Sequence, residues 1–421
     1  MGWMIRATKE RLISLLRQSE PYMKTDMVYL ASGGFWLTIA MAVSMLGGFG
    51  LALAFGNLVP KEVFGNYKFV FSLAGLFGTV ALTSIGTAVT QSVARGYDGA
   101  LRHGFRADLL WSIPSTILML AGAAYYLWNE NMVVGLSLII AGIGTTLLSA
   151  FNVYSSYLQG KKDFRRNTIY GLAIDILPPL LLIGVMLSSA RDYVPAYVAT
   201  YFFIMIVLSA FFYARTTSTY RPGDNRNPEM VRNALHLSLM NVLGRIASYI
   251  DKILIFHFLG AAPLAIYTFA AAPSQYVLRL NGIFRTLALP KLATRDIQAL
   301  KESLPRKMGI HFLVALIVTA FYITLVPYFF QLLFPQYIES IPYAQALGIL
   351  ILSAPGIWLG QTLIAHMRTR ELYIINTISP VIKIGLYATL IPIYGIWGVI
   401  YATIAAGAMG TVVAWWAYRQ L

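Results

Sequence analysis

The sequence predicts an all-α integral membrane protein with about 12 transmembrane helices in two six-helix lobes. Three observations lead to this prediction: the composition, the spacing of apolar stretches and the distribution of basic residues. Of the 421 residues, 58% are hydrophobic and only 12% are charged, and the mean hydropathy is +0.66. Ordinary globular domains are roughly 45–50% apolar and about 25% charged. The composition therefore indicates a chain that lies mostly in lipid.

Apolar stretches of the right length occur twelve times along the chain. A helix needs about 20 mainly apolar residues to cross a bilayer. The charge-poor stretches that meet this length are Met27–Val59, Phe69–Ala94, Leu109–Trp128, Met132–Leu158, Thr168–Ser189, Tyr193–Ala214, Leu235–Leu259, Pro263–Leu289, Met308–Phe334, Ile341–Met367, Leu372–Ile391 and Gly395–Tyr418. Only Pro392–Tyr394 separates the last two, so a tight turn is expected there.

The basic residues of the connecting loops give an independent test of this helix count. Lys and Arg concentrate in short cytoplasmic loops. The opposite loops hold only Lys61 and Arg191, whereas alternate segments beginning with the N-terminus hold 24 basic residues. If one helix had been missed, every later loop would be assigned to the wrong side of the membrane and this asymmetry would be lost. We therefore predict that both termini are cytoplasmic and that the protein is a multi-pass protein of the cytoplasmic (inner) membrane.

The charge balance and the missing motifs exclude several functions. Thirty-two Lys and Arg against 17 Asp and Glu give a net charge of +15. Most of these charges lie in loops that face anionic lipid headgroups, so nucleic acid is not an expected partner. The chain has no cysteine, and it has no phosphate-binding loop, zinc pair or hydrolase elbow. We expect a transporter without catalytic residues, metal or cofactor, and not an enzyme.

The chain divides into two halves around a polar stretch. The expected parts are an amphipathic cytoplasmic segment at 1–26, an N-lobe at 27–214, a cytoplasmic linker at 215–234 and a C-lobe at 235–421. Short matches recur at an offset of 200 residues, such as Tyr67 with Tyr267 and Arg95 with Arg295. Each half has an even number of crossings, so the repeats should be parallel, with a site at their interface.

Several short motifs carry a resemblance to a known superfamily. They are Pro60–Tyr67 and its counterpart Gly260–Tyr267, Asp251-Lys252, Leu289–Ala293, and Ile391–Gly398. In these motifs the chain resembles the multidrug/oligosaccharidyl-lipid/polysaccharide flippase superfamily, and within it the polysaccharide transporters typified by O-antigen flippases. The second Gly-x-Tyr turn departs from the family habit, because Ile266 stands where glycine is frequent.

The resemblance implies a central, V-shaped cavity between the lobes that opens alternately to the two sides of the membrane. It implies a flippase that moves a polyprenyl-diphosphate-linked oligosaccharide to the outer leaflet for surface polysaccharides such as the O-antigen of lipopolysaccharide. Its partners would be the lipid-linked oligosaccharide, membrane lipids, a coupling proton or sodium ion, and a polysaccharide polymerase with its chain-length regulator.

Two other functions remain open at this point. The first is a cation-coupled multidrug antiporter of the same superfamily, which usually carries an acidic residue in its first helix. Met27–Val59 contains no charged residue, which favours the sugar-lipid branch. The second is a membrane polysaccharide polymerase or ligase. Such enzymes need a large outer loop with catalytic groups, and the predicted outer loops are only about ten residues long.

Charged residues inside predicted helices are the candidates for binding. A charge at mid-depth in the bilayer costs at least about 2.5–3.5 kcal/mol, so each needs a reason. A diphosphate or an acidic sugar is an anion that cationic side chains could hold in a low-dielectric cavity. The candidate substrate-binding residues are Lys68, Arg245, Tyr249, Lys252, Arg279, Arg285 and Lys383.

The spacing of these candidates leaves alternatives open. Arg245 and Lys252 are seven residues apart and share a helical face, with Tyr249 between them. They could line the cavity together, or Arg245 could pair with Asp251 while Asp251-Lys252 forms a structural fork. Arg279 and Arg285 lean toward different faces, and Arg285 could instead reach the headgroups.

The acidic candidates are Asp175 and Asp251, which we consider as coupling-ion residues. Asp175 precedes Pro178-Pro179, which break the helix and free backbone carbonyls. The alternative is an ion pair between Asp175 and Lys383, because their helices occupy corresponding places in the two halves.

Overall fold

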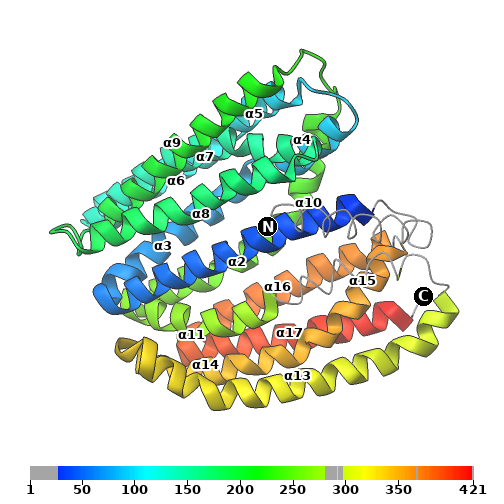
Figure 1. The fold of residues 1–421 in the computed structure, drawn as a ribbon. Coiled ribbons are helices and arrows are strands. Elements are labelled where there is room, and N and C mark those ends of the chain that lie inside the picture. The colour runs from blue at the N-terminus through cyan, green and yellow to red at the C-terminus, as the bar shows by residue number, and fades with distance from the viewer. Residues whose placement is uncertain (1–26, 280–291, 293–296, 367, 420–421) are drawn as a thin grey trace, which may run out of the picture.

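The computed structural model describes residues 27–279, 292, 297–366 and 368–419, and within them all regular structure is helical (Figure 1). The helices of the first half are α2 (Met27–Leu58), α3 (Lys61–Phe77), a 3-10 turn η1 (Gly78–Val80), α4 (Ile85–Ala94), α5 (Ala100–Trp111), α6 (Ile113–Trp128), α7 (Met132–Gly160), α8 (Phe164–Met186) and α9 (Val194–Tyr220).

The second half starts after a short connection at 221–229. Its elements are α10 (Met230–Leu259), α11 (Ala261–Arg279), α13 (Ile297–Leu333), η2 (Pro335–Ser340), α14 (Ile341–Gly348), η3 (Ile349–Gly356), α15 (Ile357–Ala365), α16 (Thr369–Tyr394) and α17 (Ile396–Arg419). Within the described residues each predicted stretch overlaps a helix or a run of short helices, and Pro263–Leu289 does so as far as Arg279. The predicted count of twelve membrane crossings is not confirmed by this overlap. The predicted amphipathic segment at 1–26 lies outside the described residues.

Ten segments of the described chain are long and apolar enough to cross a membrane. They are Met41–Leu58, Lys61–Val80, Ala100–Trp128, Met132–Gly160, Phe164–Met186, Val194–Tyr220, Glu302–Leu333, Pro335–Ala365, Arg370–Tyr394 and Ile396–Arg419. The protein is therefore a multi-pass membrane protein. Neither α10 nor α11 is among the ten, and α10 carries Arg245, Asp251 and Lys252 along one helix.

Local sequence signals explain where several helices begin and end. Asn131 and Asp163 act as N-caps of α7 and α8, because their side chains accept hydrogen bonds from the backbone N–H groups of Val134 and Arg166. A single residue, Gly395 with φ +59°, separates α16 from α17. The turn expected at Pro392–Tyr394 therefore lies one residue later, because these residues end α16 and Gly395 takes a positive φ that favours glycine.

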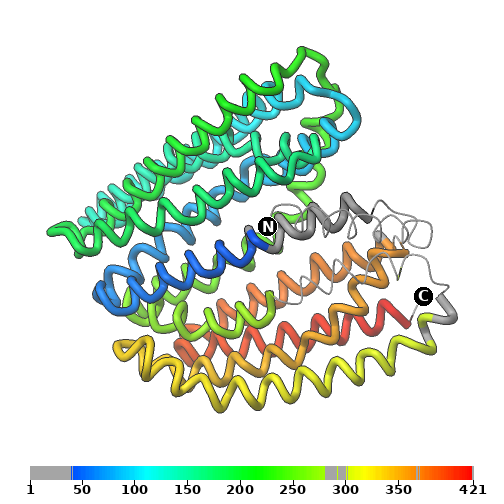
Figure 2. The backbone as a smooth tube through the Cα atoms, in the orientation of Figure 1, coloured from blue at the N-terminus to red at the C-terminus, as the bar shows by residue number. Residues whose placement is uncertain are grey.

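The two halves join at one end of the molecule. One hydrophobic core contains residues from α2 and α3 together with residues from α11, α13 and η2. Phe64 packs against Phe269 with ring centroids 4.9 Å apart. Lys61 forms an ion pair with Glu339 at 3.1 Å. From this end the two groups of helices diverge in Figures 1 and 2, toward the end where α4 and α15 lie.

Helix α10 belongs to the packing of both halves. Near its start, the Ser238 hydroxyl accepts a hydrogen bond from the backbone N–H of Ser84, which precedes α4. Further along, α10 packs against α11 and α16. Figure 1 shows α10 passing from one group of helices into the other. It therefore connects the lobes along its whole length rather than only through the loop before it.

The two halves approach each other closely at Gly65 of α3. A Cβ atom built at Gly65 would overlap the backbone carbonyl of Ala261 at the start of α11. We expect Gly65→Val to separate α3 from α11 and to lower the free energy of unfolding by about 1–3 kcal/mol or more, because overpacking a close contact is destabilising. The thermal melting temperature of the purified protein measures this.

Gly171 of α8 provides the matched control for this substitution. A Cβ at Gly171 has open space around it, so Gly171→Val should change the melting temperature far less. Equal melting temperatures for the two variants would mean that the α3–α11 contact does not hold the lobes together.

Candidate functional site

Three cationic side chains from three helices line one cavity of about 220 Å³. Lys68 comes from α3, Lys252 from α10 and Arg279 from α11, so both halves contribute. The polar groups of Tyr267, Thr268, Gln275 and Tyr276 complete the wall. We call this space the cationic cavity.

Aromatic rings hold two of these cations in place. The Lys68 ammonium lies 5.1 Å from the ring centroid of Phe64 and 5.8 Å from that of Tyr67. The Arg279 guanidinium lies 5.4 Å from the ring centroid of Tyr276. In the described part of the chain neither cation has a carboxylate within ion-pair distance. Cation–π contacts orient a positive charge but do not neutralise it, so both charges remain available to a ligand.

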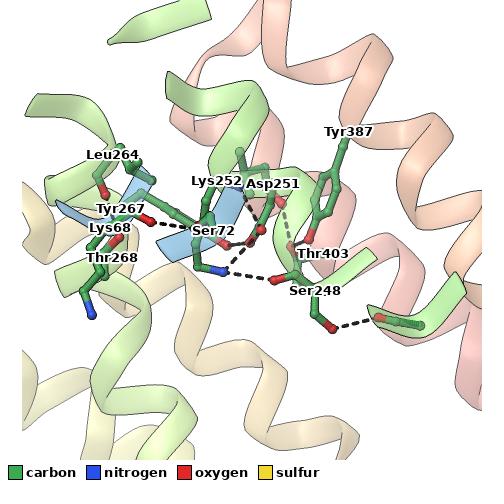
Figure 3. Close-up of polar contacts among 12 residues, drawn as sticks. Lys68, Ser72, Ser248, Asp251, Lys252, Leu264, Tyr267, Thr268, Tyr387 and Thr403 are labelled. Carbon is green, nitrogen blue, oxygen red and sulfur yellow. Dashed lines mark hydrogen bonds and ion pairs between the residues drawn. The ribbon is translucent and has the colours of Figure 1, made fainter. Parts of the chain in front are cut away.

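Asp251 positions the third cation. The Lys252 ammonium donates to Asp251 Oδ1 at 3.3 Å and to the Ser248 carbonyl oxygen at 3.1 Å (Figure 3). The Tyr267 hydroxyl donates to Asp251 Oδ2 at 2.8 Å. Asp251 is buried, and its two carboxylate oxygens are both occupied. This arrangement corresponds to the structural fork that the sequence left open, with Lys252 held at the cavity wall.

Lys383 and Tyr387 lie beside this network on α16. The Tyr387 hydroxyl is 2.9 Å from the Thr403 hydroxyl of α17, as Figure 3 shows. The Lys383 ammonium is 5.4 Å from the Tyr387 ring centroid. Lys383 is not among the residues that line the cationic cavity. It adds positive charge near Asp251 and Lys252 without lining the cavity itself.

The balance of charge around the site is positive. Among the described residues, four cationic side chains share this region with one carboxylate, Asp251, which is already held by Lys252 and Tyr267. This charge balance favours an anionic ligand, because cations in a low-dielectric cavity interact strongly with an opposite charge. A diphosphate matches several separated cationic donors better than a single carboxylate does.

The structure places Arg245 and Lys252 in two different cavities. Arg245 lines a space of about 360 Å³ on the side of the N-lobe. Tyr249, one turn from each, packs against α3, and a Cβ at Gly75 would overlap its ring. Tyr249 is not among the residues that line either cavity.

The remaining candidates lie elsewhere. Asp175 of α8 is packed against α2, where a Cβ at Gly47 would lie 2.6 Å from the Asp175 carbonyl oxygen. The ion pairs of the described chain do not include one between Asp175 and Lys383. Arg285 lies outside the described residues.

Comparison with known families decides the classification. The polysaccharide biosynthesis protein family matches residues 30–281, more than half of the chain. The chain belongs to the polysaccharide biosynthesis protein family. A search of curated protein sequences gave no significant match.

Similarity to solved structures identifies the fold of this member of the polysaccharide biosynthesis protein family. It is similar to the inward-facing conformation of a multidrug resistance MATE family transporter of the MOP superfamily, at 16% identity and a TM-score of 0.69, over 92% of this chain and 98% of the other. The outward-facing conformation of such a transporter gives 16% identity and a TM-score of 0.63, over 92% and 96%. A MOP superfamily transporter from Pyrococcus furiosus gives 15% and 0.61, over 93% and 95%. The fold is that of the MOP superfamily transporters.

One acidic residue of this polysaccharide biosynthesis family member was missed by the sequence analysis. Asp108 of α5 is 2% exposed and lines the 360 Å³ cavity. The predicted stretch began at Leu109, so the search for charges inside helices excluded its neighbour. The signal was present nonetheless, because Ser112 and Ser115 follow Asp108 at four and seven residues and lie on the same helical face.

Proposed function

We propose that this protein is a flippase that carries a lipid-linked oligosaccharide from the cytoplasmic to the outer leaflet for surface polysaccharide assembly. The observation that carries the proposal is the cationic cavity, to which Lys68, Lys252 and Arg279 contribute from α3, α10 and α11. The family supports a role in polysaccharide biosynthesis, and the fold supports transport by alternating access.

The chemistry of the cavity favours a diphosphate-linked headgroup. Placing several cations in a membrane is costly, and a bound anion offsets that cost. Charge-assisted hydrogen bonds from Lys and Arg to phosphate oxygens are among the strongest in proteins. The polar head would cross in the cavity while the prenyl tail stays in lipid.

The end at which the two groups of helices diverge is consistent with uptake from the cytoplasm. The connections between α4 and α5, α7 and α8, and α9 and α10 carry Arg95, Lys161 and Arg226. These connections lie at the end where the two groups of helices diverge (Figure 1). By the distribution of basic residues this end is cytoplasmic. The proposed location is the inner membrane with both termini in the cytoplasm, and the proposed polymer is an O-antigen or a related surface polysaccharide.

A multidrug antiporter is the second candidate, because the solved structures with a similar fold include multidrug transporters. The described residues of α2 argue against it, since Met27–Leu58 contains no acidic side chain that could bind a cation.

Deleting the gene in its native host tests the proposal. We expect complete, unpolymerised, lipid-linked repeat units to accumulate on the cytoplasmic leaflet, with loss of polymer at the cell surface. Mass spectrometry of the lipid extract would then identify the sugar. Repeat units that accumulate on the outer leaflet would indicate a polymerase or ligase. Unchanged lipids together with increased drug sensitivity would indicate the antiporter.

A further inference from the structure

The 360 Å³ cavity beside α5 has polar walls and holds a buried carboxylate. Its lining includes Asp108 and the side chains of Ser112, Ser115, Thr145, Thr146, Ser149 and Asn152, together with Thr83 and Arg245. We call it the hydroxyl cavity. Most of its polar side chains carry both a donor and an acceptor, whereas the cationic cavity offers mainly positive donors.

Two polar atoms that line the hydroxyl cavity lack a hydrogen-bond partner. Asp108 Oδ2 and Thr83 Oγ1 are buried and unpartnered within the described chain. Asp108 is only 2% exposed, and no ion pair to it is formed in the described part of the protein. A buried acceptor without a donor is costly, and a ligand that brings hydroxyl donors would remove that cost.

The hydroxyl cavity and the cationic cavity lie along the same pair of helices. On α3 the first is lined by Ala74 and the second by Lys68. On α10 the corresponding residues are Arg245 and Lys252. At 1.5 Å per residue, both separations correspond to roughly 10 Å along the helix axes. That distance is on the scale of one sugar next to a diphosphate.

We propose that the hydroxyl cavity is a saccharide subsite, in which Asp108 accepts hydrogen bonds from the sugar hydroxyls next to a diphosphate bound in the cationic cavity. This inference rests on the proposed function and names the part of the substrate that each cavity recognises. Arg245 supplies donors at the same cavity, and the Thr83 hydroxyl supplies one further group.

Size and charge favour a sugar over a cation in this cavity. A single water occupies roughly 30 Å³ in the liquid, so a bare ion would fill little of the 360 Å³. Ligand pockets for small molecules begin near 300 Å³. Arg245 also lines the cavity, and its positive charge would repel a cation.

Binding measurements on the purified full-length protein test the subsite. The probes are farnesol, farnesyl diphosphate, and a panel of farnesyl diphosphates that carry glucose, galactose, rhamnose or N-acetylglucosamine, each titrated in choline chloride without sodium. We expect at least one glycosylated probe to bind about ten-fold more tightly than farnesyl diphosphate. Asp108→Asn should remove about this ten-fold gain, the scale of a hydrogen bond to a charged group, and leave the Kd of farnesyl diphosphate unchanged.

Two further variants distinguish a loss of binding from a loss of folded protein. Thr83→Val removes an unpartnered hydroxyl without breaking a hydrogen bond, so it should weaken the glycosylated probe without lowering the melting temperature. Asp192→Asn changes an exposed carboxylate that pairs with Arg191 in the loop before α9 and should bind every probe as the wild type does.

The outcomes separate the two proposals. If the wild type binds farnesyl diphosphate no more tightly than farnesol, the cationic site and the proposed function fail. If it binds farnesyl diphosphate but no glycosylated probe more tightly, the saccharide subsite alone is refuted. The subsite is also refuted if Asp108→Asn weakens all diphosphates equally, or if it changes only the binding of sodium in a separate titration.

Discussion

Transport should fall by about 10- to 100-fold when Lys252 is replaced by alanine, because each charge-assisted hydrogen bond to a phosphate contributes on the order of 1.5–3 kcal/mol. The Lys252 ammonium lies at the wall of the cationic cavity and is held there by Asp251 and the Ser248 carbonyl. The measurement is the rate at which lipid-linked repeat units reach the outer leaflet in cells that carry the variant, normalised to the folded protein in the membrane.

Lys68→Ala is the stricter form of the same prediction. In the described chain Lys68 has contacts to aromatic rings but no carboxylate partner. Its removal should therefore reduce transport while leaving the melting temperature unchanged or raised. Lys252→Ala, in contrast, leaves Asp251 with only Tyr267 as a side-chain partner and should lower the melting temperature as well.

The control is Arg232→Ala on the first turn of α10. Arg232 pairs with Glu229 at an exposed position, where ion pairs contribute little, so transport should be unaffected. Arg245→Ala should also reduce transport, because Arg245 lines the hydroxyl cavity. Unimpaired transport in both Lys68→Ala and Lys252→Ala would remove the cationic cavity from the pathway.

Cross-linking the two lobes at the end where they join should abolish transport. Lys61 and Glu339 form an ion pair across the end where the halves join, at 3.1 Å between Nζ and Oε1. The chain has no cysteine, so Lys61→Cys with Glu339→Cys gives a single reactive pair without background. A short bismaleimide across this pair should hold this end closed, and the proposed alternating access requires it to open.

A second cysteine pair within the N-lobe controls for chemical modification. Lys161 and Asp98 form an ion pair at 2.5 Å inside one half, so a link between Lys161→Cys and Asp98→Cys should leave transport unchanged. Each single-cysteine variant treated with the same reagent should also remain active. Transport that persists after complete cross-linking of residues 61 and 339 would show that the lobes need not separate at this end.

The helices could be predicted because lipid imposes a single rule on them. Residues that face lipid must be apolar, so α7 was predicted at Met132–Leu158 and is observed at Met132–Gly160. The rule fails where a helix extends beyond the apolar layer. Helix α13 begins at Ile297, but its predicted stretch began only at Met308. The prediction was too short because the first turns of α13 carry charged residues, which a search for apolar stretches leaves out.

The distribution of the site residues between cavities could not be predicted from the sequence. Helical periodicity correctly puts Arg245 and Lys252 on one face of α10. It does not report that α3 offers a glycine, Gly75, opposite Tyr249. Tyr249 packs there, and Arg245 and Lys252 line different cavities. The convergence of Lys68 with Lys252 also required the packing of α3 against α10, which links residues almost 200 positions apart.

The core shared by the two lobes makes them one unit of folding. Apolar side chains of α3 and α11 are buried in the same cluster, and α10 packs on both halves. Separating the halves would expose that cluster to solvent or lipid without a matching surface. Near residue 220 the chain passes from one lobe to the other, but the two lobes do not unfold independently. We expect them to unfold in a single cooperative transition.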